Sequence, residues 1–246
     1  MVHGGPTITS VHDIDAEPTP RVPLSRARVL RAAVEIADAE GVDGLTMRRI
    51  AAELDVEAMS LYHHVPNKES VLDGMVEMVI EEIVAAGAAL TGPAAEDDWR
   101  GALRARLLAA RAVQMRHKWA PAVIATRTGM SMAIVAWFDG LLGVLRAGGF
   151  SFDLAHHSLH ALGSHALGFA QELFAPGSPE EEAEQEEEFD QMMEFFPNLA
   201  GMMAEIAHDG PDDTIGWCDD QTEFEFTIDV LIDGLERRRQ LELAAD

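Results

Sequence analysis

The first apolar pattern in the chain predicts a helix over residues 26–40. Its apolar residues recur at steps of four, three and one, which places them on one helical face: Val29, Ala33, Ile36 and Ala37. Ser25 precedes the run and is a favourable N-cap, and Gly41 suits the C-terminal stop. The segment therefore carries its own start and stop signals.

Two short helices joined by a tight turn are predicted next. Thr46 caps a helix over residues 47 to about 54, and a turn at residues 55–56 separates it from a third helix over residues 57 to about 64. Pro66 ends the third helix, because the residue before a proline disfavours the helical region. One compact apolar set packs the pair: Ile50, Ala51, Leu54, Val56 and Leu61. A short helix pair with a supporting helix before it is typical of a helix-turn-helix, whose second helix enters a major groove of DNA.

The rest of the chain is predicted to be helical as well. Asn67 caps a long fourth helix with the apolar stripe Leu72, Met75, Val79 and Ile83. Further helices are expected over residues of roughly 97–118, 120–126, 130–147, 153–174, 190–208 and 222–241. No convincing alternating strand pattern is found. The predicted fold class is therefore all-α, with an N-terminal three-helix module and a helical body.

The net charge of −25 is distributed unevenly along the chain. Residues 1–20, a proline-punctuated segment predicted to be a disordered leader, hold three acids and no Lys or Arg. Residues 21–70, the predicted DNA-binding domain, hold seven Lys and Arg against eight Asp and Glu, whereas residues 71–246, the body, hold eleven against thirty-two. A DNA-binding surface needs a local basic face rather than a basic chain, so the acidic total does not exclude DNA.

The outward side of the third predicted helix carries no negative charge, which suits an approach to phosphate. Its candidates are Ala58, Met59, Ser60, Tyr62 and His63. Polar and basic residues ring the edges and can bind backbone oxygens: Thr46, Arg48, Arg49 and Lys68. The alternatives are helix packing for Tyr62 and His64 and an ordinary solvated charge for Arg48 and Lys68.

The residues from Gly44 to Val56, followed by Leu61-Tyr62-His63-His64-Val65 and Asn67-Lys68, resemble the N-terminal module of the TetR family of transcriptional regulators. The whole string over about twenty residues is specific, whereas a single dipeptide of it is not. The chain departs from the family at Asp55, where glycine is usual. The turn there calls for a left-handed backbone, which Asp tolerates better than most residues, at a cost of about 1 kcal/mol.

This resemblance implies roles by position, with double-stranded operator DNA as the partner. Thr46, Arg48 and Lys68 would touch phosphate, and Arg48 would also come within reach of a base edge. The third helix would supply apolar contact from Ala58 and Met59, groove contact from Ser60, Tyr62 and His63, and backbone contact from His64.

The remainder of the chain resembles the C-terminal body of the tetracycline repressor subgroup of that family. The resemblance rests on Gly149-Phe150-Ser151-Phe152, a helix with Gly163 and Gly168, and Phe224-Glu225-Phe226 followed by Gly234-Leu235-Glu236. It implies a homodimeric repressor that a small molecule releases from an operator with half-sites about 34–36 Å apart. Two apolar stripes fit a dimer interface: Leu159, Leu162, Ala166, Phe169 and Leu173, and Phe224, Ile228, Leu231 and Leu235. The alternative is that each stripe faces the subunit's own core.

The resemblance also places an effector pocket between the fourth helix and the body. The chain has Val84, Arg106 and Ala110 where the tetracycline repressor has drug-contacting His, Asn and Phe, and Ile124 near its metal-coordinating His. Glu172 matches an acidic position, but one acid without the imidazole is no metal site, so we expect no tetracycline–magnesium binding. Trp137 and a Met-rich surrounding indicate a small, largely apolar effector, with ordinary core packing as the alternative for any single Met. Arg106 would pair with an anionic ligand group if it faces the pocket.

Two other classes of function were weighed against this one. An enzyme or metalloprotein is indicated by the clustered His156, His157, His160 and His165, of which His156 and His160 share a helical face. However, the metalloprotease pattern needs glutamate where His157 stands, and no glycine-rich phosphate loop or nucleophile elbow is found. We therefore expect no catalytic residue, metal or cofactor. A protein-interaction module, with the acidic body binding a basic partner, would show no DNA binding.

The remaining composition indicates the compartment. Cys218, the only cysteine, forms no internal disulfide and no multi-cysteine zinc site. No apolar run reaches membrane-spanning length, and the N-terminus lacks the pattern of a secretory signal. We expect a cytoplasmic protein without membrane contact.

Overall fold

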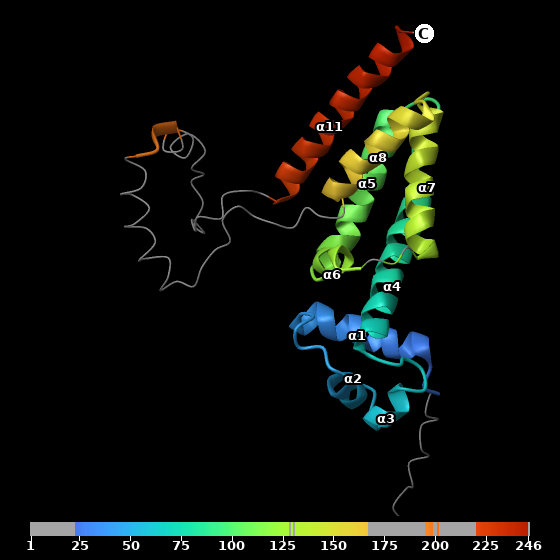
Figure 1. Ribbon diagram of the computed structural model, residues 1–246, viewed down its shortest axis with the longest axis vertical. Coiled ribbons are helices and arrows are strands. Elements are labelled where there is room, and N and C mark those ends of the chain that lie inside the picture. The colour runs from blue at the N-terminus through green and yellow to red at the C-terminus, as the bar shows by residue number, and fades with distance from the viewer. Residues whose placement is uncertain are drawn as a thin grey trace, which may run out of the picture.

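The structure is a computed structural model that describes residues 23–127, 129, 131–166, 195–198, 201 and 220–245. Every regular element within these ranges is a helix, which confirms the all-α prediction. The helices are α1 (Arg26–Glu40), α2 (Met47–Glu53), α3 (Ala58–Leu61), α4 (Lys68–Ala88), α5 (Trp99–Arg116), α6 (Ala120–Ala125), α7 (Met132–Ala147), α8 (Phe152–Ala166) and α11 (Asp220–Leu243). Helices α1 to α3 lie together at one end, and α4 runs from them into the body (Figure 1).

The predicted signals at both ends of α1 are confirmed. The Ser25 hydroxyl accepts a hydrogen bond from the backbone N–H of Arg28 and caps the helix. Gly41 follows the last residue with a φ of +80°, and its N–H donates to the Ala37 carbonyl. The predicted apolar face is buried against the rest of the module and against α4.

The α2–turn–α3 unit agrees with the prediction except in the length of α3. The Thr46 hydroxyl caps α2 by accepting from the Arg49 N–H, and Asp55 has the expected left-handed backbone, with a φ of +52°. Helix α3 ends at Leu61 rather than near His64. The N–H groups of His64 and Val65 both donate to the Leu61 carbonyl, which closes a turn over residues 62–64. The chain turns here because α4 begins only a few residues later, after Pro66.

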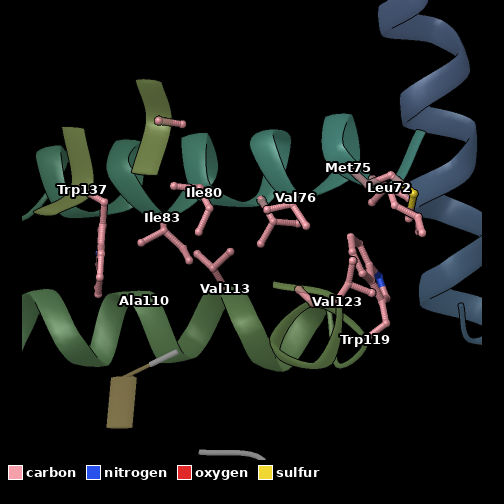
Figure 2. Packing of buried hydrophobic residues seen from close by; sticks show 14 of the residues in the cluster. Leu72, Met75, Val76, Ile80, Ile83, Ala110, Val113, Trp119, Val123 and Trp137 are labelled. Atoms are coloured by element: carbon pink, nitrogen blue, oxygen red, sulfur yellow. The ribbon is translucent and has the colours of Figure 1, made fainter. Parts of the chain in front are cut away.

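Helix α4 joins the module to the body. Asn67 caps it through its side-chain oxygen, which accepts from the Ser70 N–H at 2.8 Å. Its predicted stripe is buried throughout: Leu72, Met75, Val79 and Ile83. Figure 2 shows this face against Val113 of α5, Trp119 just before α6, and Val123 of α6. The same helix also packs on α1 and α7, so α4 contacts both the module and the body.

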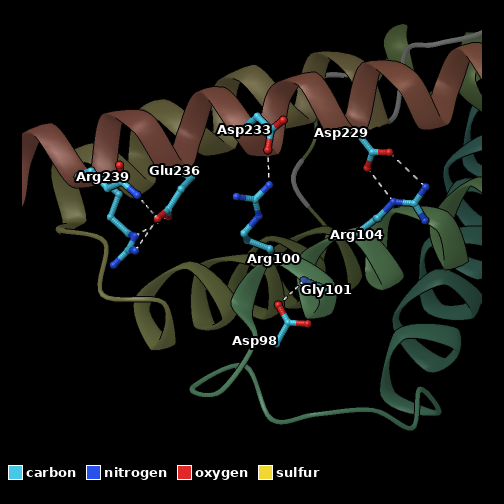
Figure 3. A network of polar contacts seen from close by, with 9 residues as sticks. Asp98, Arg100, Gly101, Arg104, Asp229, Asp233, Glu236 and Arg239 are labelled. Carbon is cyan, nitrogen blue, oxygen red and sulfur yellow. Dashed lines mark hydrogen bonds and ion pairs between the residues drawn. The ribbon is translucent and has the colours of Figure 1, made fainter.

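Polar contacts hold α11 on α5 at the edge of the body. Arg104 donates to Asp229 at 2.7 Å, and Arg100 pairs with Asp233 (Figure 3). Arg104 also donates to Glu225 at 2.7 Å. A hydrogen bond from Gln221, followed by the one from Arg104, holds the pKa of Glu225 below its ordinary value. The surface seam therefore adds to the apolar packing between these helices.

The C-terminal apolar stripe faces the subunit's own core, which corrects the prediction that it forms a dimer interface. Phe224, Ile228 and Leu235 are buried and Leu231 is half-buried, because α11 packs this face on α5 and α8. In α8, Leu162 is buried and Leu159 half-buried, while the side chains of Ala166, Phe169 and Leu173 lie outside the described residues. The opposite face of α11 exposes Phe226 and Val230, at 64% and 53%.

Candidate nucleic-acid interface and effector cavity

The predicted DNA-reading residues lie on an outward surface of α3 and the turn that follows it. Leu61 is fully buried and anchors α3 on the module, as do Ile50 and Ala51 of α2. The other side exposes Met59 by 72% and Tyr62 by 44%, and His63 is exposed beside them. Ala58, Ser60 and His64 are half-buried. The structure thus turns the large side chains of this segment, apart from Leu61, toward solvent.

The two neighbouring arginines of α2 differ in their partners. Arg49 donates to Glu40 of α1 at 2.7 Å and to Glu53 at 2.8 Å. The hydrogen bond from Arg49 holds the pKa of the Glu40 carboxyl below its ordinary value, and the bonds to Glu40 and Glu53 raise the pKa of Arg49. No hydrogen bond or ion pair joins the exposed Arg48 to another described residue. Arg48 is therefore ready to contact an external phosphate, while Arg49 first has to leave two carboxylates.

The start of α4 offers a further contact to an anion. Lys68 is its first residue and Asn67 its cap, so the unpaired N–H groups of the first turn and one ammonium group lie at the same edge of the module. Thr46 lies at the start of α2 and is exposed. Thr46 and Lys68 thus lie at the starts of the two helices that precede and follow α3.

A cavity of about 140 Å³ lies between α4, α5 and α7, where the effector pocket is predicted. Of the six predicted ligand residues, the structure brings three to it: Val84, Arg106 and Trp137. Ala110 is fully buried in the packing between α4 and α5, and Ile124 lies on α6; neither lines the cavity. Glu172 lies outside the described residues.

Sequence reasoning missed the other residues of the cavity wall. They are apolar or lack a side chain: Ile83, Gly87, Ala88, Ala136, Gly140 and Leu141. Gly87 and Gly140 lie within helices α4 and α7, where glycine is unfavourable. Their presence was the available sequence signal for the cavity wall.

A larger and more polar pocket of about 550 Å³ was not predicted. It lies beside the first turns of α4 and the segment between α6 and α7. Arg127 lines it and binds Glu69 at 2.7 Å and Asp73 at 3.2 Å, and these contacts raise the pKa of Arg127. The arginine of the pocket is therefore already paired with two of the acids that line it.

A buried histidine joins the module to the body. His117 Nδ1 lies 2.8 Å from Asp38 of α1, and its Nε2 lies 3.1 Å from Glu82 of α4. The indole N–H of Trp119 donates to the same Asp38 carboxylate at 2.7 Å. Carboxylates only accept hydrogen bonds, so both contacts of His117 form together when both ring nitrogens carry a proton. We call this set of four residues the junction.

The pKa of Glu82 in the junction reflects two opposed effects. Burial by itself raises it, but hydrogen bonds from Arg116 and His117 outweigh this and hold it below the ordinary value. The ionised carboxylate is therefore the form that the fold stabilises.

The outward helix-turn-helix surface and the helical body with its cavity define a DNA-binding regulator with a sensory domain. Residues 29–75 match the family model "Bacterial regulatory proteins, tetR family", and residues 92–239 match "Tetracyclin repressor-like, C-terminal domain". The chain belongs to the TetR family of transcriptional regulators, with a tetracycline-repressor-like C-terminal domain. Members of this family are regulatory DNA-binding proteins that act as dimers with small-molecule effectors.

Two curated relatives and one solved structure illustrate the likeness. The chain is 30% identical over 227 residues to the HTH-type transcriptional repressor DrrR1 of Streptomyces coeruleorubidus, a match that covers 88% of this chain and 79% of the relative. It is 29% identical over 212 residues to the class A tetracycline repressor protein from transposon 1721 of Escherichia coli, covering 86% and 90%. The structure of the Streptomyces coelicolor TetR family protein ActR in complex with (S)-DNPA superposes with a TM-score of 0.66 at 25% identity, covering 87% and 98%.

Two further features concern the described part of the chain as a whole. No helix in the described part of the chain is long and apolar enough to cross a membrane. No group of three or more His, Cys, Asp or Glu in that part is arranged to hold a metal ion. His156 and His160 do stack edge to face, with ring centroids 4.7 Å apart, but His165 has no described side chain.

Proposed function

We propose that this protein is a ligand-responsive repressor that binds operator DNA as a homodimer through residues 21–70. Residues 71–246 would form its sensing and dimerisation domain. The surface of α3 and its following turn carries the proposal, because the exposed side chains of residues 58–64 include no acid in a chain with a net charge of −25. The proposal includes no catalytic activity, and a repressor of operator DNA would act in the cytoplasm.

The DNA contacts follow from the geometry of the module. Met59, Ser60, Tyr62 and His63 would face the major groove, with Ala58 beside them. Thr46, Arg48, His64 and Lys68 would bind phosphate, whereas Arg49 would chiefly fix α2 on α1 through Glu40. The exposed Phe226 and Val230 of α11 would form part of the contact with a second subunit.

Release would use α4, which lines the cavity with Ile83 and Val84 and begins directly after the DNA-reading turn. A ligand in the cavity would favour one placement of α4 and so change the distance between the two reading heads of the dimer. The junction supports this route, because Glu82 lies one and two residues before those cavity residues and connects through His117 to α1.

The effector would differ from tetracycline–magnesium. Val84 and Arg106, which by resemblance stand where that repressor contacts its drug, both line the cavity, and its described wall includes no imidazole. Isothermal titration with the tetracycline–magnesium complex should show no micromolar binding, and micromolar or tighter affinity would overturn this assignment.

Binding of the purified protein to the DNA flanking its own gene, measured by fluorescence anisotropy over a salt series, tests the function. We expect saturable, sequence-preferring binding that weakens steeply as salt rises. Lys68→Ala should lower the slope of log K against log salt by about 1, and Arg31→Ala, an exposed position on α1, should leave it unchanged. Absence of any binding above the non-specific level, even at low salt, would contradict the proposal.

A further inference from the structure

Arg106 brings a positive charge to the effector cavity, and no residue in the described part of the chain pairs with it. It projects from α5 into the wall formed by α4 and α7. A methyl group added at Gly87 would lie 3.4 Å from Arg106 Nη1, and one added at Gly140 would lie 3.7 Å away. The two glycines therefore leave the room in which the guanidinium sits.

Two other arginines of α5 form ion pairs with carboxylates, whereas Arg106 forms none with a described residue. Arg104, two residues earlier, binds two carboxylates of α11, and Arg116 binds Glu82. No hydrogen bond or ion pair connects Arg106 to any described residue, in a chain with 43 acids. A guanidinium keeps its charge at any pH at which a protein is stable, so this charge is half-buried without a counter-ion from the described part of the chain.

The described wall of the cavity contains no acid. Arg106 is its one charged residue, and Ile83, Trp137 and Leu141 supply an apolar surface around it. Half-burying a charge beside such a surface is unfavourable unless something pairs with it. A ligand that brings both an apolar body and an anionic group satisfies the wall and the guanidinium together.

We propose that the effector is a small amphipathic anion, an apolar ring bearing a carboxylate or a similar planar anionic group. The group accepts two hydrogen bonds from Arg106, and the ring lies against Trp137 between α4 and α7. This rests on the proposed function, and names the chemical class of the molecule that operates it. Since the body around the cavity is acidic, long-range attraction does not draw the anion in, and recognition depends on this one guanidinium.

The size of the cavity selects the probe. Its volume of about 140 Å³ is close to that of an engineered cavity that holds benzene, of about 150 Å³. Benzoate and its neutral isostere benzamide therefore test the site, with an expected Kd for benzoate on the order of 1 mM. Both are titrated into the full-length protein at constant ionic strength without DNA, and Kd is obtained by calorimetry and from the thermal unfolding midpoint.

We expect wild-type protein to bind benzoate at least about tenfold more tightly than benzamide. Arg106→Met should abolish that preference while benzamide binding stays, and Arg31→Met, the control on an exposed arginine, should keep it. Arg106→Lys retains the charge without the planar fork, so it should weaken benzoate more than benzamide. This second variant decides the matter if Arg106→Met does not fold.

Equal affinities for the two probes in wild-type protein, no benzoate binding in the millimolar range, or a preference that survives in Arg106→Met would each overturn the proposal. These outcomes are separate from those of the DNA assay. If the protein binds the operator and a neutral compound releases it from DNA while benzoate does not, the repressor function is supported and the anion site is contradicted. If benzoate binds through Arg106 but the protein binds no DNA, the anion site is supported and the repressor function is contradicted.

Discussion

The α3 surface of the module, where we propose DNA contacts, and the polar surface of the body differ in whether their charged and polar groups have partners within the described part of the chain. On the body, Arg100 and Arg104 of α5 pair with carboxylates of α11. On the module, no ion pair or hydrogen bond joins the side chains of Arg48, Tyr62 or Lys68 to another described residue. A surface that the fold leaves unsatisfied is suited to bind something else, whereas a surface that pairs its own charges stabilises the fold. The same criterion distinguishes Arg106 from Arg104, two residues apart on one helix.

The largest effect is expected from an acid placed on the α3 surface, whose polar groups lack partners in the described part of the chain. Met59→Glu puts a carboxylate at a position exposed by 72%, where it would face the major groove between the phosphate backbones. We expect operator affinity to fall at least about a hundredfold. The exchange removes an apolar contact to a base, and the new negative charge is repelled by the neighbouring phosphates. Stability should change by no more than about 0.5 kcal/mol, since the site is on the surface.

The matched control is Leu90→Glu, the same kind of exchange at an exposed apolar position beyond α4. It should leave operator binding unchanged in the same anisotropy assay. Equal binding by wild-type protein and Met59→Glu would show that α3 does not face DNA, and would leave the module as a structural element of an interaction protein.

The next largest effect is expected at the junction, where module and body share one set of hydrogen bonds. His117→Ala removes the group that lies between Asp38 and Glu82. We expect a loss of about 1–2 kcal/mol, because two partly buried carboxylates lose a partner. Hydrogen exchange should rise in α1 and at the end of α5 but not in α11, and effector-induced release of DNA should weaken.

Arg104→Ala provides the comparison on the body's own surface. Its ion pairs to Glu225 and Asp229 are more exposed, so we expect a loss below about 1 kcal/mol that shrinks as salt rises. An effect on DNA release as large as that of His117→Ala would contradict the assignment of the junction as the specific link between the two parts.

These two regions also differ in how far the sequence predicts them. Caps at Ser25, Thr46 and Asn67 are set by residues within a few positions, so local reasoning predicted them, and the family resemblance predicted the left-handed turn at Asp55. The ion pair of Arg49 was not predicted, because its partner Glu40 lies nine residues earlier, on a different helix. Contacts at that separation depend on how α1 and α2 pack, and no periodic pattern records this.

In the body, the pattern predicts helices but not what their apolar faces meet. The stripe from Phe224 to Leu235 has the spacing of an interface and is buried in its own subunit, since a stripe of one width serves both purposes. Likewise, resemblance placed Ala110 and Ile124 in the pocket, but the rotation of each helix about its axis decides which residues reach the cavity. Val84, Arg106 and Trp137 do.

A smaller effect is expected in the module at Asp55, the one non-glycine residue with a positive φ in the described part of the chain. Asp55→Gly should raise stability by about 1 kcal/mol, because glycine adopts this backbone without the strain of a Cβ atom. Asp43→Gly, an exposed position without a left-handed backbone, should instead lower stability or leave it unchanged. Urea unfolding measures both, and a loss of stability in Asp55→Gly would show that the contacts of the aspartate outweigh the strain.

The smallest effect per group is expected from lowering the pH, which protonates carboxylates in both the module and the body. Hydrogen bonds hold the pKa of Glu40 in the module low through Arg49, and that of Glu236 in the body low through Arg239. Glu82 and Glu225, also in the body, are lowered as described above. A carboxyl whose folded pKa is depressed stabilises the fold above its ordinary value of 4.5, and this contribution is lost as the pH falls through the lowered pKa.

Urea midpoints should therefore stay level from neutral pH to about pH 5 and fall below it. Trp99, Trp119 and Trp137 all lie in the body, so tryptophan emission follows that region, at low protein concentration because the sequence pI is about 4.6. Glu82→Gln should start from a lower midpoint at neutral pH and decline less steeply, since it no longer has that carboxylate to protonate. Glu81→Gln, its exposed neighbour, should follow wild type. A midpoint that rises on acidification, or an unchanged slope in Glu82→Gln, would mean that the ionised carboxylate of the junction does not stabilise the contact between module and body.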